Sequence, residues 1–287
     1  MTRSKIFIEL TRLNKPIGFM LLFWPCSWGL AYAYSVNANF NLFLYYLILF
    51  FLGSVLMRSA GCIVNDIVDK DFDKKVERTK SRPLASGKIS LNQSFIYVII
   101  LCMAALIILL QFNILTIVLG MSSMFLAFTY PFMKRITYWP QLFLGVTFNW
   151  GIIMAWTAMN DYITLEIVIL YISAIFWTLG YDTIYGAQDM SEDEIIGLKS
   201  TSIKFKNNIK LFVSICYLTC SALILIFYTI FLKLNYFSLI FILLFFITLF
   251  YQLIKFDKKK PETCLHMFKL NNVAGLFLFT SLLLINI

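Results

Sequence analysis

Histidine is almost absent from this chain, which has only His266 among its 287 residues. A single histidine excludes catalysis by a histidine pair and makes a histidine-ligated metal site untenable. The six cysteines form no zinc-like CxxC pair, and nothing in their placement demands a disulfide framework. Any chemistry that the chain performs must therefore depend on other side chains.

Charged residues are also scarce, at 14%, whereas 60% of the residues are hydrophobic and the mean hydropathy is +0.81. Soluble domains average about 45–50% apolar and about 25% charged residues. Lipid offers no partner to backbone N–H and C=O groups, so only helices and closed barrels cross a membrane. The apolar runs are long and do not alternate as barrel strands do. The composition therefore predicts an all-α integral membrane protein.

Nine apolar segments are long enough to cross a bilayer, since a spanning helix needs roughly 20 such residues. The first lacks a small-residue cleavage site and is expected to be retained. We expect residues 1–287 to form a single transmembrane domain, a bundle of nine helices. The nine segments are 16–34, 42–64, 93–111, 114–132, 139–159, 163–181, 209–232, 236–254 and 271–287.

Lysine and arginine gather in alternate connections between these segments. With the N-terminus in the cytoplasm, the opposite side keeps only Lys233, as the positive-inside rule requires. The net charge of +9 then reflects orientation on a membrane and not a nucleic-acid partner. We expect a bacterial inner (plasma) membrane. The cytoplasmic segments would be 1–15, 65–92, 133–138, 182–208 and 255–270.

A first acidic motif follows the second apolar segment. Asp66, Asp69 and Asp73 are spaced i, i+3, i+7, which places three carboxylates on one face of a helix. Carboxylates this close repel one another, and burial at a membrane edge adds a desolvation cost. A bound cation relieves both effects, and ligands that are all oxygen suit Mg²⁺. Asp71 points off this face.

A second acidic motif follows the sixth segment. Asp182, Asp189 and Asp193 are spaced i, i+7, i+11, which again predicts one helical face. Two such faces meeting at one membrane surface would hold two metal ions and a diphosphate. The separation of four spans suggests two related half-bundles, each with one motif. Taken alone, either motif could also be an ordinary solvated acidic loop.

Basic residues near the motifs suit a phosphate ligand. Arg78, Arg82 and Lys199 can bind phosphate oxygens, and arginine can do so through two N–H groups. The alternative is that they are only orientation charges. Tyr130 and Tyr185 could line a cavity and stabilise a carbocation by cation–π contact.

Arg58 is a charged residue inside an apolar segment. It lies seven residues before Asn65 on the same helical stripe, about 10 Å deeper in the membrane. A charge at that depth usually faces a cavity or a partner. It could hold an anionic group of a second substrate below the metal site. The alternative is a structural ion pair or a side chain that snorkels to the surface.

Several stretches resemble the UbiA-type superfamily of intramembrane prenyltransferases over most of the chain. Residues 58–66 (RSAGCIVND) resemble its first motif, and residues 78–87 (RTKSRPLASG) resemble the loop that follows. Residues 130–141 (YPFMKRITYWPQ), together with PIG at 16–18 and LFWP at 22–25, resemble its hydroxybenzoate branch.

The resemblance implies an Mg²⁺-dependent enzyme that moves a polyprenyl group from its diphosphate to 4-hydroxybenzoate, ortho to the hydroxyl, in ubiquinone biosynthesis. Asn65 would join Asp66, Asp69 and Asp73 in the first metal motif and help bind substrate, and Asp182, Asp189 and Asp193 would form the second. The six Asp residues would be catalytic, and Arg58 would contact the aromatic acid. Ser191 and Glu192 depart from the branch, which often has further Asp there. The implied diphosphate contacts are Arg78, Arg82, Lys134 and Lys199.

Three other functions compete with this one. A related prenyltransferase could act on another acceptor, such as a dihydroxynaphthoate or haem. An alcohol phosphotransferase of the phospholipid type would need a compact DGxxAR-type motif, which the sequence lacks. A cation transporter would place its acidic residues near the bilayer midplane, whereas these acids fall at one membrane edge.

Overall fold

The computed structural model describes residues 2–77, 79–232 and 235–286, and these residues form helices and connections without any strand. Arg78 lies outside the described residues. The helices are α1 (Arg3–Thr11), α2 (Ile17–Asn37), α3 (Phe40–Asp73), α4 (Leu91–Leu109), α5 (Ile114–Ile136), α6 (Pro140–Asn160), α7 (Leu165–Gly186), α8 (Met190–Ile195), α9 (Thr201–Lys204), α10 (Ile209–Phe231), α11 (Tyr236–Lys255) and α12 (Pro261–Leu283), followed by a 3-10 turn, Leu284–Asn286.

Nine of the described helices, α2 to α7 and α10 to α12, have 19 residues or more, and each corresponds to one predicted span. Within the described ranges, eight are long and apolar enough to cross a membrane. The ninth, α12, begins ten residues before the predicted span. Its first half carries Glu262, His266 and Lys269, which lower its hydropathy. The prediction of an all-helical membrane protein is confirmed.

Local sequence signals set where several helices begin. Ser90 and Gln93 form a reciprocal capping box at the start of α4. The side chain of Asn113 accepts a hydrogen bond from the backbone N–H of Thr116 and caps α5. Proline stands at the first position of α6 and of α12, where its missing N–H costs nothing.

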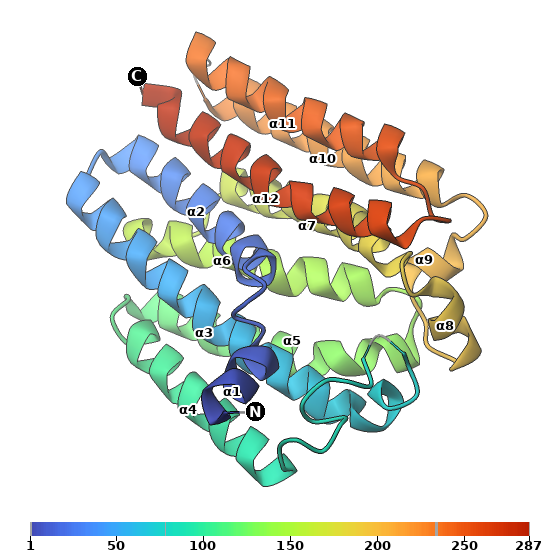
Figure 1. Cartoon of the computed structure of the whole chain (residues 1–287). Helices are drawn as coiled ribbons and strands as arrows, with labels where there is room; N and C mark the ends of the chain where they lie inside the picture. The colour runs from blue at the N-terminus through green and yellow to red at the C-terminus, as the bar shows by residue number, and fades with distance from the viewer. Residues whose placement is uncertain (1, 78, 233–234, 287) are drawn as a thin grey trace.

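The long helices run side by side as a bundle (Figure 1). α2 packs against α3, α6 and α12, while α7 packs against α6, α10 and α12. The α2–α6 contact depends on Gly29, where an added Cβ would lie 2.4 Å from the carbonyl oxygen of Ile152. Lipid provides no hydrophobic driving force for helices to associate. Close packing at small residues such as this glycine therefore stabilises the contact between the two helices.

A buried polar cluster ties α7, α10, α11 and α12 together. Asn271 Oδ1 accepts a hydrogen bond from Trp177 Nε1 at 2.9 Å and another from Gln252 Nε2 at 3.2 Å. The hydroxyl of Tyr217 donates to Gln252 Oε1 at 2.5 Å. Because these groups pair inside the bundle, they fix how the four helices face one another.

The first acidic motif lies on α3, which continues nine residues past the predicted end of its span, as far as Asp73. The connection after α3 and the short helices α8 and α9 lie at one end of the bundle (Figure 1). We call this the motif end. The two acidic motifs therefore lie at the same end, as predicted.

Candidate functional site

A cavity of about 1500 Å³ enters the bundle from the motif end. Its walls come from α2, α3, α4, α5 and α6, with the last turn of α7 and part of α8 at the mouth. Along α5 the lining runs from Lys134 to Gly120, about 21 Å at 1.5 Å per residue. The mouth is charged, and the interior is mostly apolar.

The first motif presents three buried carboxylates on one face of α3. Asp66 is 2% exposed, Asp69 1% and Asp73 7%, and all three line the cavity. Arg82 Nη1 lies 3.2 Å from Asp66 Oδ1 and 2.7 Å from Asp73 Oδ2. This one guanidinium therefore joins two carboxylates that stand two turns apart on the helix.

Asp69 is paired from the other side, by α5. Lys134 Nζ forms a short ion pair with Asp69 Oδ2, and Arg135 Nη2 lies 3.4 Å from Asp69 Oδ1. By contrast, the side chain of Asp71 is 86% exposed and contacts only Lys74 among the described residues, at 3.3 Å. The face predicted from the i, i+3, i+7 spacing is the face that lines the cavity.

The prediction for the second motif was wrong in its local structure. α7 ends at Gly186, Asp189 precedes α8 with a non-helical ψ of 6°, and Asp193 lies within α8. The i, i+7, i+11 face does not exist because the helix breaks between the first and second aspartate. All three nevertheless line the cavity, since the break turns the chain back over its mouth.

Arg12 belongs to the site, although nothing in the sequence distinguishes it from the orientation charges. Its Nη2 lies 2.5 Å from Asp66 Oδ1, the oxygen that Arg82 also contacts. The residue follows α1 in the left-handed region, with φ of 57°. α1 packs against α3, and its Phe7 also lies against Tyr97 of α4, with the ring centroids 5.1 Å apart. These contacts hold Arg12 at the mouth.

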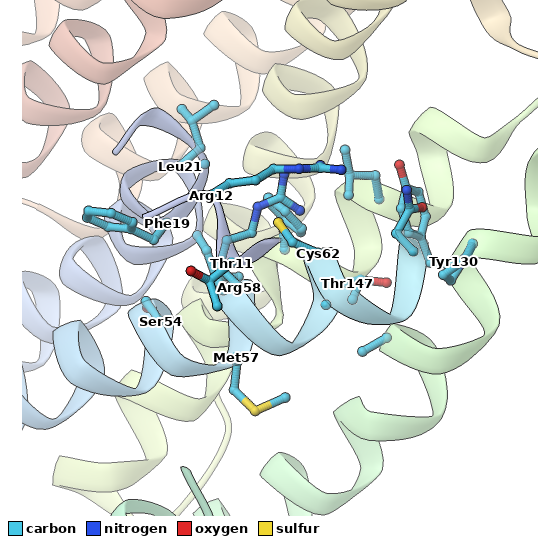
Figure 2. Close-up of a pocket in the computed structure, with 18 of the residues that line it drawn as sticks. Thr11, Arg12, Phe19, Leu21, Ser54, Met57, Arg58, Cys62, Tyr130 and Thr147 are labelled. Atoms are coloured by element: carbon cyan, nitrogen blue, oxygen red, sulfur yellow. The ribbon is translucent and has the colours of Figure 1, made fainter. Parts of the chain in front are cut away.

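Arg58 extends into the cavity below the carboxylates, beside Arg12 and across from Tyr130 (Figure 2). Its guanidinium carbon lies 5.3 Å from the ring centroid of Phe148 on α6. Its Nε is buried and has no hydrogen-bond partner among the described residues. A buried donor of a charged group without a partner is costly, so this position calls for an anionic ligand.

Gly18 on α2 makes room for Arg58. A Cβ added there would lie 2.9 Å from Arg58 Nε. The guanidinium therefore occupies a slot between the backbone of α2 and the ring of Phe148.

The other predicted site residues divide into two groups. Asn65, Tyr130, Lys134 and Tyr185 line the cavity as expected. Lys199 does not line it: its Nζ donates to the carbonyl oxygen of Ile136 at 3.2 Å and lies 5.7 Å from the Tyr138 ring centroid. The structure does not bring Lys199 to the site, because its chain segment pairs with the end of α5.

The deeper part of the cavity is apolar and reaches the lipid-facing surface. Leu106, Leu109 and Met124 line it between α4 and α5. Met103 and Met121 also line it, and each is 54% exposed. A long apolar chain can therefore pass from the cavity into the surrounding lipid.

The carboxylate oxygens at the mouth suit a hard cation that is also coordinated by oxygens of a bound ligand. Within the described residues, no group of three or more His, Cys, Asp or Glu side chains is close enough to hold a metal ion by itself. The carboxylates instead face guanidinium and ammonium groups. Mg²⁺ commonly takes one or two carboxylates and completes its shell with phosphate oxygens and water. The oxygen donors at this mouth fit that pattern.

Comparisons with known proteins point to one family. The model of the UbiA prenyltransferase family matches residues 22–279. The mitochondrial 4-hydroxybenzoate polyprenyltransferase of Rattus norvegicus is 41% identical over 283 residues, 98% of this chain and 75% of that protein. Among solved structures, a UbiA homolog from Aeropyrum pernix K1 has a TM-score of 0.77 at 21% identity, covering 91% of this chain and 96% of that one. A UbiA homolog from Archaeoglobus fulgidus, bound to DMAPP and Mg²⁺, has a TM-score of 0.68 at 15% identity, covering 95% and 98%.

Proposed function

The chain belongs to the UbiA prenyltransferase family, and from this premise we propose that it transfers a polyprenyl group from a polyprenyl diphosphate to 4-hydroxybenzoate in ubiquinone biosynthesis. The new bond forms at the ring carbon ortho to the hydroxyl, and diphosphate is released. The 41% identity to the rat 4-hydroxybenzoate polyprenyltransferase over nearly the whole chain supports this assignment. The observation that carries it is one cavity with carboxylates at its mouth, an unpartnered guanidinium nitrogen below them and an apolar interior.

The diphosphate would bind at the motif end. Asp66, Asp69 and Asp73 on one side, and Asp182, Asp189 and Asp193 on the other, would hold Mg²⁺ against it. The A. fulgidus homolog was solved with DMAPP and Mg²⁺ bound, which supports a prenyl diphosphate and a divalent cation as the ligands. When bound, Mg²⁺ neutralises the diphosphate and makes it a better leaving group.

The basic residues at the mouth would exchange partners when substrate binds. Arg12, Arg82 and Lys134 now pair with the carboxylates. Once those carboxylates hold a cation, the same donors are free to bind phosphate oxygens. Charge-assisted hydrogen bonds of this kind are about twice as strong as neutral ones.

The acceptor would bind deeper in the cavity than the diphosphate. Arg58 would hold the carboxylate of 4-hydroxybenzoate, because its buried Nε needs an anionic partner. Tyr130 and Tyr185 line the cavity beside this position, where their rings can stabilise positive charge on the allylic carbon. The ring carbon attacks as the carbon–oxygen bond to diphosphate breaks, and it then loses its proton. The apolar walls keep water away from the cation.

The location of the protein follows its relatives. The helices support a multi-pass membrane protein. The rat relative is mitochondrial, so the expectation of a bacterial plasma membrane is not supported. We propose a membrane in which a ubiquinone precursor is made, with the polyprenyl tail extending into lipid between α4 and α5.

The test is an assay of the purified full chain with labelled polyprenyl diphosphate and one aromatic acid at a time. We expect an extractable labelled product with 4-hydroxybenzoate and Mg²⁺, and none in excess chelator. Product with a dihydroxynaphthoate but not with 4-hydroxybenzoate would assign the other acceptor. Full activity in chelator would overturn the metal-dependent mechanism.

Replacing Gly18 by Ala is expected to weaken acceptor binding selectively. The new methyl group would lie 2.9 Å from Arg58 Nε and push the guanidinium out of its slot. Overpacking costs about 1–3 kcal/mol, so the KM for 4-hydroxybenzoate should rise about fivefold or more, with little change in the KM for the donor. The KM for the donor, measured on the same variant, is the control, because the atoms nearest to a Cβ at Gly18 all belong to Arg58 and not to the basic residues at the mouth. An unchanged acceptor KM in Gly18→Ala would show that Gly18 does not position Arg58.

A further inference from the structure

A second, smaller cavity of about 360 Å³ lies at the motif end, away from the acidic motifs. It is bounded by the start of α10 and by the connection between α11 and α12. One water molecule occupies about 30 Å³ in the liquid, so this space can accept a polar group of several heavy atoms. The larger cavity shares no lining residue with it.

Positive charge dominates the lining of this cavity. Lys210, Lys258 and Lys259 contribute three ammonium groups against one carboxylate, that of Asp257. Asp257 Oδ1 accepts a hydrogen bond from the backbone N–H of Lys259 at 3.0 Å. No described acidic side chain forms an ion pair with any of the three lysines. The cavity therefore carries an uncompensated positive charge.

Two further contacts show that the cavity is a formed feature of the fold. Lys258 Nζ donates to the carbonyl oxygen of Lys206 at 2.6 Å, which joins the two connections that bound the cavity. Lys206 in turn pairs with Glu194 at 2.6 Å. Asn207 and Asn208 also line the cavity, and their side-chain amides form no hydrogen bond with a described residue. Amide and ammonium donors thus converge on one space.

The position of the cavity indicates which kind of anionic ligand it would bind. α10 begins at Ile209 and α11 ends at Lys255, so the cavity lies where two membrane-spanning helices meet the aqueous boundary. Beside it, the two helices present exposed apolar side chains: Leu211 is 61% exposed, Ile215 52% and Ile254 57%. A basic cavity at the aqueous boundary beside an apolar surface matches a phospholipid, whose phosphate lies at that boundary and whose acyl chains lie in the hydrocarbon region. Basic pockets between spanning helices bind anionic headgroups in this way.

We propose that this cavity binds the headgroup of an anionic phospholipid, with the acyl chains lying against α10 and α11. Lys210, Lys258 and Lys259 contact the phosphate, and Asn207 and Asn208 donate to its ester or headgroup oxygens. A free phosphate ion has the same oxygen chemistry but lacks the apolar contact with the two helices. The site is independent of the reaction proposed above.

The experiment compares lipids with identical acyl chains. The full chain in detergent micelles is titrated with dioleoyl phosphatidylglycerol or dioleoyl phosphatidylcholine, and bound lipid is counted by native mass spectrometry. We expect preferential retention of phosphatidylglycerol by the unaltered chain and at least about tenfold weaker retention by K210Q/K258Q/K259Q. The matched control is K70Q/K74Q/K75Q, which removes the same charge at the same membrane edge without touching the cavity.

Three results would overturn the proposal. Equal loss of phosphatidylglycerol in both triple variants would show a diffuse charge effect. Equal retention of the two lipids by the unaltered chain would show no headgroup recognition. Protection against thermal unfolding by millimolar inorganic phosphate, equal to that by phosphatidylglycerol, would assign a free anion. Should the triple variant fail to fold, Lys210→Glu gives the same comparison, because that side chain is exposed at the start of α10.

Discussion

Replacing Asp66 by Asn is expected to lower turnover on the order of 10³-fold, the loss found when one preorganised electrostatic contact to a transition state is removed. Asp66 is 2% exposed and faces both Arg12 and Arg82. The amide keeps the shape of the side chain but removes the charge that would bind Mg²⁺ and balance the two guanidinium groups. Asparagine is preferred to alanine because it leaves no space in the buried face.

Asp71→Asn is the matched control for this prediction. It lies in the same motif, but its side chain is 86% exposed and faces away from the cavity. The measurements are turnover with labelled polyprenyl diphosphate and, separately, binding of Mn²⁺ by calorimetry in the presence of the diphosphate. We expect Asp66→Asn to lose both and Asp71→Asn to keep both. Near-normal Mn²⁺ binding by folded Asp66→Asn would remove Asp66 from the metal site.

Replacing Arg58 by Ala is expected to raise the KM for 4-hydroxybenzoate about tenfold or more while the KM for the prenyl donor changes little. A hydrogen bond to a charged group contributes about 1.5–3 kcal/mol, and each 1.4 kcal/mol is a factor of ten. The buried Nε without a partner and the stacking on Phe148 place this guanidinium below the carboxylates and away from the mouth. Steady-state kinetics with each substrate varied in turn measures the effect.

Arg82→Ala provides the reciprocal control, because Arg82 contacts Asp66 and Asp73 at the mouth. We expect it to weaken the donor and spare the acceptor. Arg58→Lys should recover only part of the acceptor affinity, since an ammonium group cannot reproduce the two parallel donors of a guanidinium. If Arg58→Ala weakens the donor and spares the acceptor, the placement of the two substrates is wrong. The case for a carboxylate-bearing acceptor would fall with it.

The parts of the fold that were predicted correctly depend on strong local patterns. Long apolar runs located all nine long helices, because lipid leaves the backbone no other way to pair its polar groups. The spacing of Asp66, Asp69 and Asp73 gave the correct buried face, since α3 stays helical through the motif. Arg58 stood out because a charge inside an apolar segment is rare.

The parts that were missed depend on contacts between distant segments. Arg12 joins Asp66 across 54 positions, and in the sequence it looks like any other orientation charge. The break after Gly186 was missed because the i, i+7, i+11 spacing fits a continuous helix equally well. Lys199 was placed at the site because it is a basic residue near the second motif and because the family resemblance implied a diphosphate contact. In the structure its backbone N–H instead donates to the carbonyl oxygen of Lys134, and its side chain donates to that of Ile136.

The length of α3 has a consequence for how two substrates meet. Its 34 residues extend about 51 Å, well beyond the roughly 30 Å of a hydrocarbon core. One continuous helix therefore carries Arg58 within the membrane and Asp66 at its edge, about 12 Å apart along the axis. Under the roles proposed for Arg58 and Asp66, the distance between the acceptor and the leaving group is set by one continuous helix.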